Sequence, residues 1–211
     1  MKIILASKSP RRTMLLENAM IMHDCVSPAV DEEKIVQRLS GEPPEKLVEE
    51  LSRAKASSVK EALQDGDIIV IGADTVVSVD GVIFGKPKDR DDAKRMIKAL
   101  QGREHEVYTG VTVLSQKEMI TFHEKSVVSV FEMTEREIED YLETKEPFDK
   151  AGAYGIQGYF SRFIERIEGS YDNIVGLPVA KTYRALFGQG DVSLVRGVRT
   201  RDTSPCPKKR R

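Results

Sequence analysis

The stretch DIIVIGADTVVSVDGVIF, residues 67–84, decides the fold. Residues 67–79 are rich in β-branched side chains and predict a long strand, and residues 82–84 predict a returning strand. Between them, Asp80-Gly81 is a strong signal for a two-residue hairpin turn. A hairpin inside an alternation of strands and helices indicates a sheet that contains both parallel and antiparallel pairs.

Strands and helices alternate on both sides of this stretch, so we predict an α/β fold with a mixed, twisted sheet flanked by helices. The helix signals are Ser9-Pro10 at one N-terminus, a capping box of Thr134 and Glu137 at another, and Asp65-Gly66 at a C-terminus. The predicted helices are 10–18, 43–63, 91–100, one that begins after Thr134 and stops before Pro147, and 178–187. The other predicted strands are 2–6, 105–114, 118–131 and 163–167.

Composition excludes several classes of protein. The 211 residues include 40% hydrophobic and 32% charged residues and carry a formal net charge of -1, which is typical of a single globular domain without a chain-wide basic surface for nucleic acid. The apolar runs are too short for a membrane span or a signal peptide. Cys25 and Cys206 form no Cys-x-x-Cys pair, so neither a disulfide framework nor a cysteine zinc site is expected. We therefore predict a cytoplasmic protein.

The C-terminal end differs from the rest of the chain. We predict a folded domain over residues 1–187 and a basic, disordered tail over 188–211, because the tail has seven basic and two acidic residues, no aromatic residue and no periodicity. Residues 208–211 alone resemble a nucleic-acid patch, but a solvated extension is the simpler interpretation, and nucleic acid is not an expected partner.

Common catalytic motifs are missing from the sequence. It has no Gly-x-Gly-x-x-Gly after a strand, no complete P-loop, no His-Glu-x-x-His and no serine in a nucleophile elbow. Nucleophilic and zinc chemistry are therefore disfavoured. The informative residues are cations and carboxylates at positions where local structural rules disfavour them.

The first of these positions lies in SKSPRR, residues 7–12, which connects the first strand to a helix N-terminus. Free N–H groups and a partial positive charge at such an end attract anions. Arg11 and Arg12 oppose the helix dipole, which is reasonable if an anion lies between them and the helix. Arginine binds phosphate oxygens in a bidentate way. We interpret this stretch as a phosphate site, the alternative being two solvated surface arginines.

Lys55 lies on an apolar stripe of the predicted helix 43–63, together with Val48, Leu51 and Ala62. Lysine is rare on a core face unless it is paired. The side chain therefore either extends past the edge of the sheet or points into a cleft.

Asp74 follows an apolar run, residues 68–73, where burial of an unpaired carboxylate would be costly. Continuing the hairpin register from its turn places Thr75 opposite Lys86 and Asp74 opposite Pro87, so that Asp74, Thr75 and Lys86 form one local cluster. The cluster is either a structural ion pair or a carboxylate that holds a metal or activates water beside a phosphate-binding lysine.

Two further segments complete the candidate site. The acidic run Asp31, Glu32 and Glu33 is typical of a helix cap or a solvated face, but one of its carboxylates could share a magnesium ion with Asp74. The loop DKAGAYGIQG, residues 149–158, has three glycines, which suit either a tight turn or close approach of the backbone to a ligand; its Gln157 could read a base edge. Together, these cations and carboxylates suit a polyphosphate, a divalent metal and attack by water.

Four stretches in this order resemble the Maf family of nucleoside triphosphate pyrophosphatases: ASKSPRR (residues 6–12), GADTV (72–76), GKP (85–87) and residues 149–158. The resemblance extends from residue 2 to about residue 187. It implies two lobes around a nucleotide-binding cleft, as in inosine-triphosphate pyrophosphatases. It further implies hydrolysis of a nucleoside triphosphate to the monophosphate and pyrophosphate with a divalent cation, Mg²⁺ or Mn²⁺.

The resemblance also implies roles for single residues. Asp74 matches the general base and Glu32 the metal-associated carboxylate, although Asp31 and Glu33 remain alternatives; Asp74 is the second expected metal ligand, and Lys86 is grouped with these catalytic residues. The remaining expected substrate-binding residues are Ser7, Arg11, Arg12, Lys55, Thr75, Lys150 and Gln157. Among them, Arg12, Thr75 and Gln157 resemble the branch that prefers dTTP and UTP.

The same residues admit a second hypothesis, a nucleotide-binding regulator of septum formation without significant turnover, because the family is also linked to inhibition of septum formation. Such a sensor needs the phosphate site but no activated water. The family's frequent dimerisation makes a homodimer a possible assembly.

Overall fold

The protein is described here from a computed structural model, which covers residues 2–63 and 67–188. A seven-stranded sheet has the order β2-β1-β3-β5-β6-β7, with β4 paired to β3 beside this path. The pairs of β1 with β2 and with β3 are parallel and the others antiparallel, which confirms the predicted mixed sheet. The strands are β1 (Lys2–Ala6), β2 (Asp24–Val26), β3 (Ile68–Val79), β4 (Val82–Phe84), β5 (Glu104–Leu114), β6 (Met119–Val130) and β7 (Ile164–Glu168).

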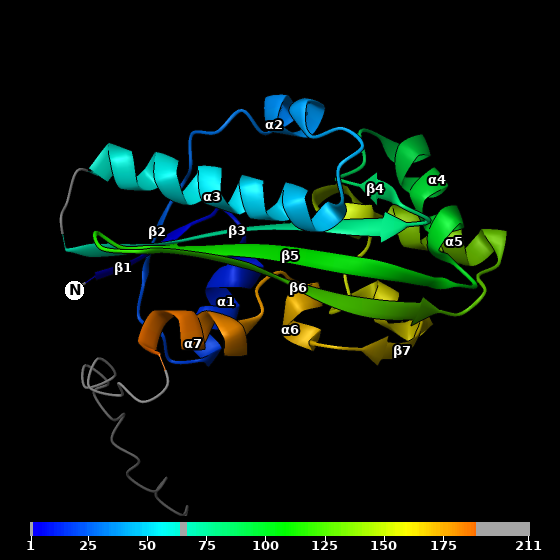
Figure 1. Cartoon of the computed structure of the whole chain (residues 1–211). Coiled ribbons are helices and arrows are strands. Elements are labelled where there is room, and N and C mark those ends of the chain that lie inside the picture. Colours follow the sequence, from blue (N-terminus) through cyan, green and yellow to red (C-terminus); the bar gives the residue numbers. More distant parts are fainter. Residues whose placement is uncertain (1, 64–66, 189–211) are drawn as a thin grey trace, which may run out of the picture.

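Helices cover both faces of the sheet. In Figure 1, α3 runs along one face with α2 above it, α1, α6 and α7 lie against the other face, and α4 and α5 pack at one end. The α-helices are α1 (Pro10–Asn18), α2 (Glu32–Arg38), α3 (Pro44–Leu63), α4 (Arg90–Leu100), α5 (Glu135–Glu143), α6 (Tyr171–Val175) and α7 (Val179–Phe187). Three short 3₁₀ segments join α5 to β7: η1 (Glu146–Asp149), η2 (Ala151–Ala153) and η3 (Tyr159–Phe163).

The long elements lie within a few residues of their predicted bounds, whereas β2, α2 and α6 were not predicted. β2 has three residues and α6 five. None of the seven residues of α2 is buried, and its only apolar residues are Ile35 and Val36, too short a pattern to reveal a helical period. These three short elements depend on the rest of the fold for their conformation. The predicted tail and the Asp65-Gly66 signal lie outside the described residues, apart from Gly188.

The sheet separates two apolar layers because side chains of a strand alternate between its faces. On one face, Val70 and Val76 of β3 pack with residues of α3, such as Ala56 and Leu51. On the other face, Ile71, Ala73 and Val77 of the same strand belong to the largest cluster, which includes residues of α1, α4, α5 and α7. The residues of β3 thus alternate between two differently built layers.

Two details of the predicted packing were wrong. Ala62 is exposed, because the buried stripe of α3 follows Val48, Leu51, Lys55 and Val59 and leaves the last turn in solvent. The β3–β4 ladder extends only from the turn to the pair of Val77 and Phe84, so Thr75 is not paired with Lys86, nor Asp74 with Pro87.

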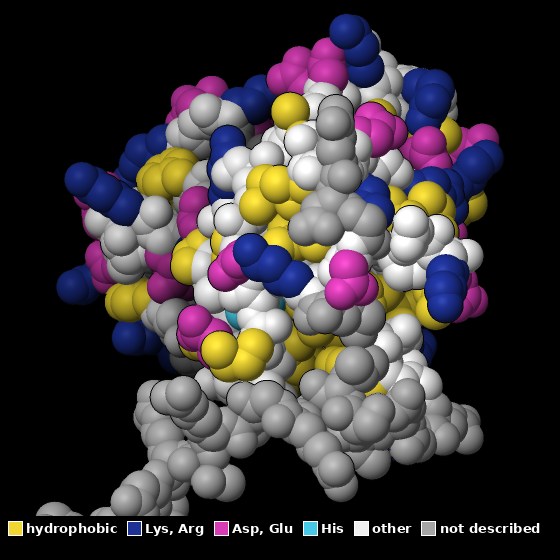
Figure 2. Space-filling model, turned by 90° about the vertical axis from the view of Figure 1, so that its left-hand side faces the viewer, with side chains coloured by type: hydrophobic (Ala, Val, Ile, Leu, Met, Phe, Trp, Pro, Cys, Tyr) yellow, Lys and Arg dark blue, Asp and Glu magenta, His cyan; other side chains and the backbone are white. Residues whose placement is uncertain are grey.

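The surface agrees with the balanced charge of the sequence. In Figure 2, basic and acidic side chains are interspersed among the described residues of the face that is shown. Within residues 2–63 and 67–188, no helix has the length and apolar character required to cross a membrane.

Candidate active site

A large pocket opens where β1 ends beside β3. Along this side, β3 pairs with β1 up to Gly72 and with β4 from Val77 onward, so residues 73–76 have no strand partner there among the described strands. Ligands of α/β proteins bind in such a crevice beyond the carboxyl end of a strand. The pocket has a volume of about 1270 Å³. Every predicted site residue lines it: Ser7, Arg11, Arg12, Glu32, Lys55, Asp74, Thr75, Lys86, Lys150 and Gln157.

Asp74 and Thr75 lie next to each other on β3 but serve opposite sides of the sheet. The Asp74 carboxylate contacts Lys55 of α3, whereas the Thr75 hydroxyl contacts Arg12 of α1. The predicted single cluster of Asp74, Thr75 and Lys86 was therefore wrong in its geometry, because strand alternation separates the first two side chains. The pocket reaches both sides through the gap at residues 73–76.

On the α3 side, Lys55 lies between two carboxylates. Its Nζ is 2.6 Å from Asp74 Oδ1 and 3.0 Å from Glu32 Oε1. The side chains of Lys55 and Asp74 are only 8% and 12% exposed, so Lys55 points into the cleft rather than past the edge of the sheet. Gly72 permits this approach, because a Cβ there would lie 2.2 Å from the carbonyl oxygen of Ser52 on α3.

The acidic run before α2 divides into separate roles. Asp31 caps α2, accepting a hydrogen bond from the backbone N–H of Lys34, and it pairs with the Lys34 side chain. Glu32 begins the helix and reaches Lys55, while Glu33 is exposed at the pocket wall. Among the three carboxylates, Glu32 is therefore the one that contacts the same Lys55 ammonium as Asp74.

On the opposite side, Arg12 makes three hydrogen bonds at the wall of the pocket. Its Nε donates to the Gly176 carbonyl at 2.8 Å, one terminal nitrogen to Thr75 Oγ1 at 3.1 Å, and the other to Ser7 Oγ at 3.3 Å. Burial lowers the pKa of the Arg12 guanidinium, and the charge of Arg11 acts in the same direction, whereas the charge of Asp74 opposes the shift. These bonds hold Arg12 in one orientation.

The N-terminus of α1 has the open form that suits an anion. Ser9 is the N-cap and Pro10 is the first helical residue, as predicted, but the Ser9 side chain makes no capping hydrogen bond. The Ser9 backbone N–H instead donates to Ser7 Oγ at 3.1 Å. Ser7, Ser9 and Arg11 all line the pocket, so this end of the helix faces the site.

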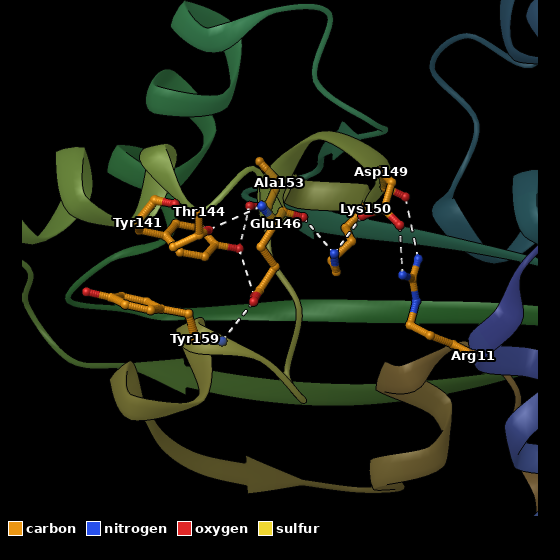
Figure 3. Close-up of polar contacts among 8 residues, drawn as sticks. All are labelled: Arg11, Tyr141, Thr144, Glu146, Asp149, Lys150, Ala153 and Tyr159. Carbon is orange, nitrogen blue, oxygen red and sulfur yellow. Dashed lines mark hydrogen bonds and ion pairs between the residues drawn. The ribbon is translucent and has the colours of Figure 1, made fainter.

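The 149–158 loop meets α1 through charged side chains, as Figure 3 shows. Arg11 donates to Asp149 Oδ2 at 3.0 Å, and Lys150 Nζ lies 2.6 Å from Asp149 Oδ1 and from the Glu146 carbonyl oxygen. Burial tends to raise the pKa of Asp149, but the bonds from Lys150 and Arg11 outweigh it and lower the pKa overall. Two of the predicted substrate-binding cations, Arg11 and Lys150, are thus paired with Asp149.

The Glu146 side chain supports the second half of the same loop (Figure 3). Its Oε2 accepts a hydrogen bond from the backbone N–H of Tyr159 at 2.8 Å, and its Oε1 one from the Tyr141 hydroxyl at 3.3 Å. A Cβ on Gly158 would lie 2.0 Å from Glu146 Oε2, so a larger residue there would displace the Glu146 carboxylate from its contacts. Gln157 precedes this glycine and is exposed at the pocket.

Comparison with known proteins identifies the family. A family model described as "Maf-like protein" matches residues 2–188. The chain belongs to the Maf family. Its Maf relatives include proteins from Carboxydothermus hydrogenoformans, 50% identical over 88% of this chain and 97% of the relative, and from Thermosipho africanus, 46% identical over 93% and 98%. Both relatives are named dTTP/UTP pyrophosphatase.

A solved structure is also similar to this Maf chain, the Ham1 protein of Staphylococcus aureus. The two superpose with a TM-score of 0.48 at 13% sequence identity, over 90% of this chain and all of the other. At that distance nothing about function follows from the similarity.

Sequence reasoning missed several residues of the Maf pocket or its support. Glu146 and Gly176 line the pocket, and Thr109 lies behind Thr75. Thr109 could have been found only from the register of β3 and β5, which pairs it with Thr75. Glu146 stands before Pro147, where it reads as an ordinary loop carboxylate; its contacts depend on the path of the loop through residue 159.

Proposed function

We propose that this chain hydrolyses dTTP and UTP to the nucleoside monophosphate and pyrophosphate. The observation that carries the proposal is one pocket in which three cations, Arg11, Arg12 and Lys55, stand with two carboxylates, Asp74 and Glu32. Maf relatives that are 46–50% identical to this chain and named dTTP/UTP pyrophosphatase support it.

The side chains of the pocket suggest where the triphosphate and the nucleobase of the substrate would bind. The triphosphate would bind at Ser7, Arg11, Lys55, Lys86 and Lys150, because cations and an open helix N-terminus suit phosphate oxygens. Arg11 and Lys150 contact Asp149 in this structure, so phosphate oxygens would compete with that carboxylate.

The nucleobase would lie at Arg12, Thr75 and Gln157. These three side chains offer hydrogen-bond groups rather than only charge. Arg12 is the most firmly held of the three, through its bonds to Gly176, Ser7 and Thr75.

The carboxylates fit a divalent cation, Mg²⁺ or Mn²⁺, that is bound together with the substrate. Asp74 and Glu32 converge within 3.0 Å of one point, the Lys55 ammonium. Among the described residues, however, no group of three His, Cys, Asp or Glu side chains gathers to hold a metal. Mg²⁺ is commonly bound by one or two carboxylates plus substrate phosphates, which matches this donor set. When bound, the cation would neutralise charge on the phosphates.

In the proposed reaction, Asp74 accepts a proton from a water molecule. The water oxygen forms a bond to the α-phosphorus, the bond from that phosphorus to the bridging oxygen breaks, and pyrophosphate leaves. Lys55 orients the Asp74 carboxylate through their contact at 2.6 Å. Arg11 and Lys86 stabilise the negative charge on the departing pyrophosphate.

The test is pyrophosphate release from dTTP, UTP, CTP, 7-methyl-GTP and inosine triphosphate, each with Mg²⁺, with Mn²⁺ and with EDTA. We expect metal-dependent release from dTTP and UTP. Release mainly from another substrate would contradict the proposed base preference but would still support the hydrolysis of a nucleoside triphosphate to pyrophosphate. Binding of dTTP without release from any substrate would instead support the nucleotide-binding regulator.

The remaining proposals concern the setting of the enzyme. We propose a nucleoside triphosphate as its partner, the cytoplasm as its compartment and a homodimer as its assembly; nucleic acid and membranes are not proposed partners. Size-exclusion chromatography with light scattering tests the assembly. A monomeric mass at micromolar concentration would contradict the homodimer.

A further inference from the structure

A chain of hydrogen bonds leads from the pocket into the interior behind Thr75. Arg12 donates to Thr75 Oγ1 at 3.1 Å, Thr75 Oγ1 lies 2.9 Å from Thr109 Oγ1, and Thr109 Oγ1 donates to the backbone carbonyl of Asn173 at 2.9 Å. Thr109 has no exposed surface. Its hydroxyl therefore depends on these protein partners rather than on solvent.

The two ends of this series of hydrogen bonds determine which atom donates in each of them. A guanidinium only donates hydrogen bonds and a backbone carbonyl only accepts them. Thr109 uses its one hydroxyl proton on the Asn173 carbonyl, so its oxygen must accept the proton of Thr75. Thr75 in turn accepts from Arg12 and donates to Thr109.

The acceptor at the inner end of the chain is itself held in place. The Asn173 side chain is fully buried and donates to the Val107 carbonyl at 3.0 Å and to Ser126 Oγ at 2.9 Å. Its backbone N–H donates to Ser170 Oγ at 3.3 Å, which caps α6. The backbone carbonyl of Asn173 is therefore a fixed acceptor, and the direction of donation along the series of hydrogen bonds does not reverse.

This direction decides what Thr75 offers to a ligand. A hydroxyl has one proton and two lone pairs, and here the proton goes to Thr109 and one lone pair to Arg12. Thr75 is partly exposed and lines the pocket, so the second lone pair is what it can present there. Uracil and thymine carry a ring N3–H that donates to such a lone pair, whereas N3 of cytosine has a lone pair of its own.

We propose that Thr109 is a positioning residue that keeps the Thr75 hydroxyl a hydrogen-bond acceptor, so that the site selects bases with a ring N–H over cytosine. This inference rests on the proposed function, because it places the base beside Thr75. It adds a buried residue, outside the pocket wall, to the determinants of base selection.

The experiment compares UTP with CTP, which differ only in the base, by the ratio of their kcat/KM values. In Thr109→Val, the Thr75 proton is free to turn toward the pocket and donate to N3 of cytosine. We expect the UTP:CTP ratio to fall about tenfold, as for the loss of one hydrogen bond in a specificity site. A purely structural defect lowers both values together and leaves the ratio unchanged.

Two variants serve as controls. Thr109→Ser keeps the hydroxyl and should keep the ratio within about twofold of the wild-type value, a change below about 0.4 kcal/mol. Thr112→Val removes a hydroxyl from the same strand with the same burial, but Thr112 bonds to Ser52 at 2.9 Å and Thr121 at 3.0 Å, away from the pocket. It should also keep the ratio.

An unchanged ratio in Thr109→Val, or an equal fall in Thr112→Val, would overturn the proposal. If Thr109→Val does not fold, Thr109→Ala removes the same hydroxyl with less bulk. Calorimetric binding of UMP and CMP to the wild-type protein gives a second test, and equal affinities would also overturn it. If no pyrophosphate is released from UTP or CTP, the proposed function fails on its own, and the UMP:CMP affinity ratio across the variants still decides the role of Thr109.

Discussion

At the pocket, the two faces of β3 differ in their side-chain contacts, which are ion pairs on one face and mainly hydrogen bonds between neutral groups on the other. The difference arises although Asp74 and Thr75 are consecutive residues. On the Asp74 side, one ammonium contacts two carboxylates: Lys55 lies 2.6 Å from Asp74 and 3.0 Å from Glu32. On the Thr75 side, one guanidinium joins a chain of neutral hydroxyls and backbone carbonyls. One strand therefore presents charged contacts on one face and a chain of directional hydrogen bonds on the other, which matches the roles proposed for the two sides.

This difference has a physical basis. Charged groups interact over several ångströms and tolerate small displacements, which suits phosphates and a cation. Hydrogen bonds between neutral groups depend on distance and angle and on which atom carries the proton, which suits discrimination between bases. Changes on the Asp74 side should therefore act mainly on turnover, and changes on the Thr75 side on selectivity.

The largest effect is expected for Asp74→Asn. The amide cannot accept the proton of the attacking water, so kcat for dTTP should fall roughly 10²- to 10⁴-fold with little change in the fold. The measurement is pyrophosphate release alongside thermal unfolding. Asp80→Asn, in the turn of the same hairpin and exposed, is the control and should keep its rate. A near-normal rate for Asp74→Asn would remove the general base from the proposal.

Lys55→Met tests whether the Asp74 side depends on its central cation for stability. Asp74 would be left as a buried carboxylate without its partner, and the free energy of unfolding should fall by about 3 kcal/mol. Urea denaturation measures this change. Lys46→Met, on the same helix in an exposed pair with Glu42, should cost less than about 1 kcal/mol. Equal costs for the two variants would mean that the Lys55 pair is no more than a surface contact.

The Thr75 side also contains a buried titratable group, His105, whose Nε2 lies 2.7 Å from the hydroxyl of the pocket residue Tyr154. Burial lowers the pKa of His105 to about 4. Below the pKa of an unfolded histidine, about 6.5, the unfolded chain takes up a proton that the folded chain does not. The folded state should therefore lose about 2 kcal/mol from this group between pH 7 and pH 5, with further loss down to about pH 4.

Urea denaturation of the wild type and of His105→Phe at the two pH values measures this contribution. The variant should lack about 2 kcal/mol of the pH dependence. His123→Phe is the control, because His123 is partly exposed and pairs with Glu49 on the other side of the sheet. If His105→Phe kept the wild-type pH dependence, the acid sensitivity would originate elsewhere.

The smallest effect is expected for Arg12→Lys. A lysine ammonium keeps the charge but loses the fork that reaches Gly176, Ser7 and Thr75 together, so KM for dTTP should rise about tenfold while kcat changes less. Steady-state kinetics measure the split. Arg95→Lys, in an exposed pair with Asp92, is the control. A fall in kcat with unchanged KM would place Arg12 on the catalytic side of the comparison.

The sequence allowed the long elements and the chemistry of the site to be predicted. The β-branched residues 67–79, the Asp80-Gly81 turn and the Thr134–Glu137 capping box are local signals, and each element formed where its signal lies. Lys55 and Asp74 stood out because each breaks an apolar pattern. The Maf resemblance added the reaction and the base preference, which local patterns do not contain.

Other features depended on contacts between distant segments. The α2 helix has only seven residues, too few for a periodic signal in its sequence, yet it delivers Glu32 to Lys55. The register beyond Phe84 could not be extrapolated, because β4 ends there.

By itself, the sequence determined where the long strands and helices form and which residues break their apolar patterns, since apolar periodicity and turn signals are local. Only the tertiary structure decided that Asp74 and Thr75 serve different faces, that Asp149 holds Arg11, and that Thr109 lies behind Thr75. The physical reason is that a hydrogen bond or ion pair requires two groups within about 3 Å, and for residues far apart in sequence only the assembled sheet brings them that close.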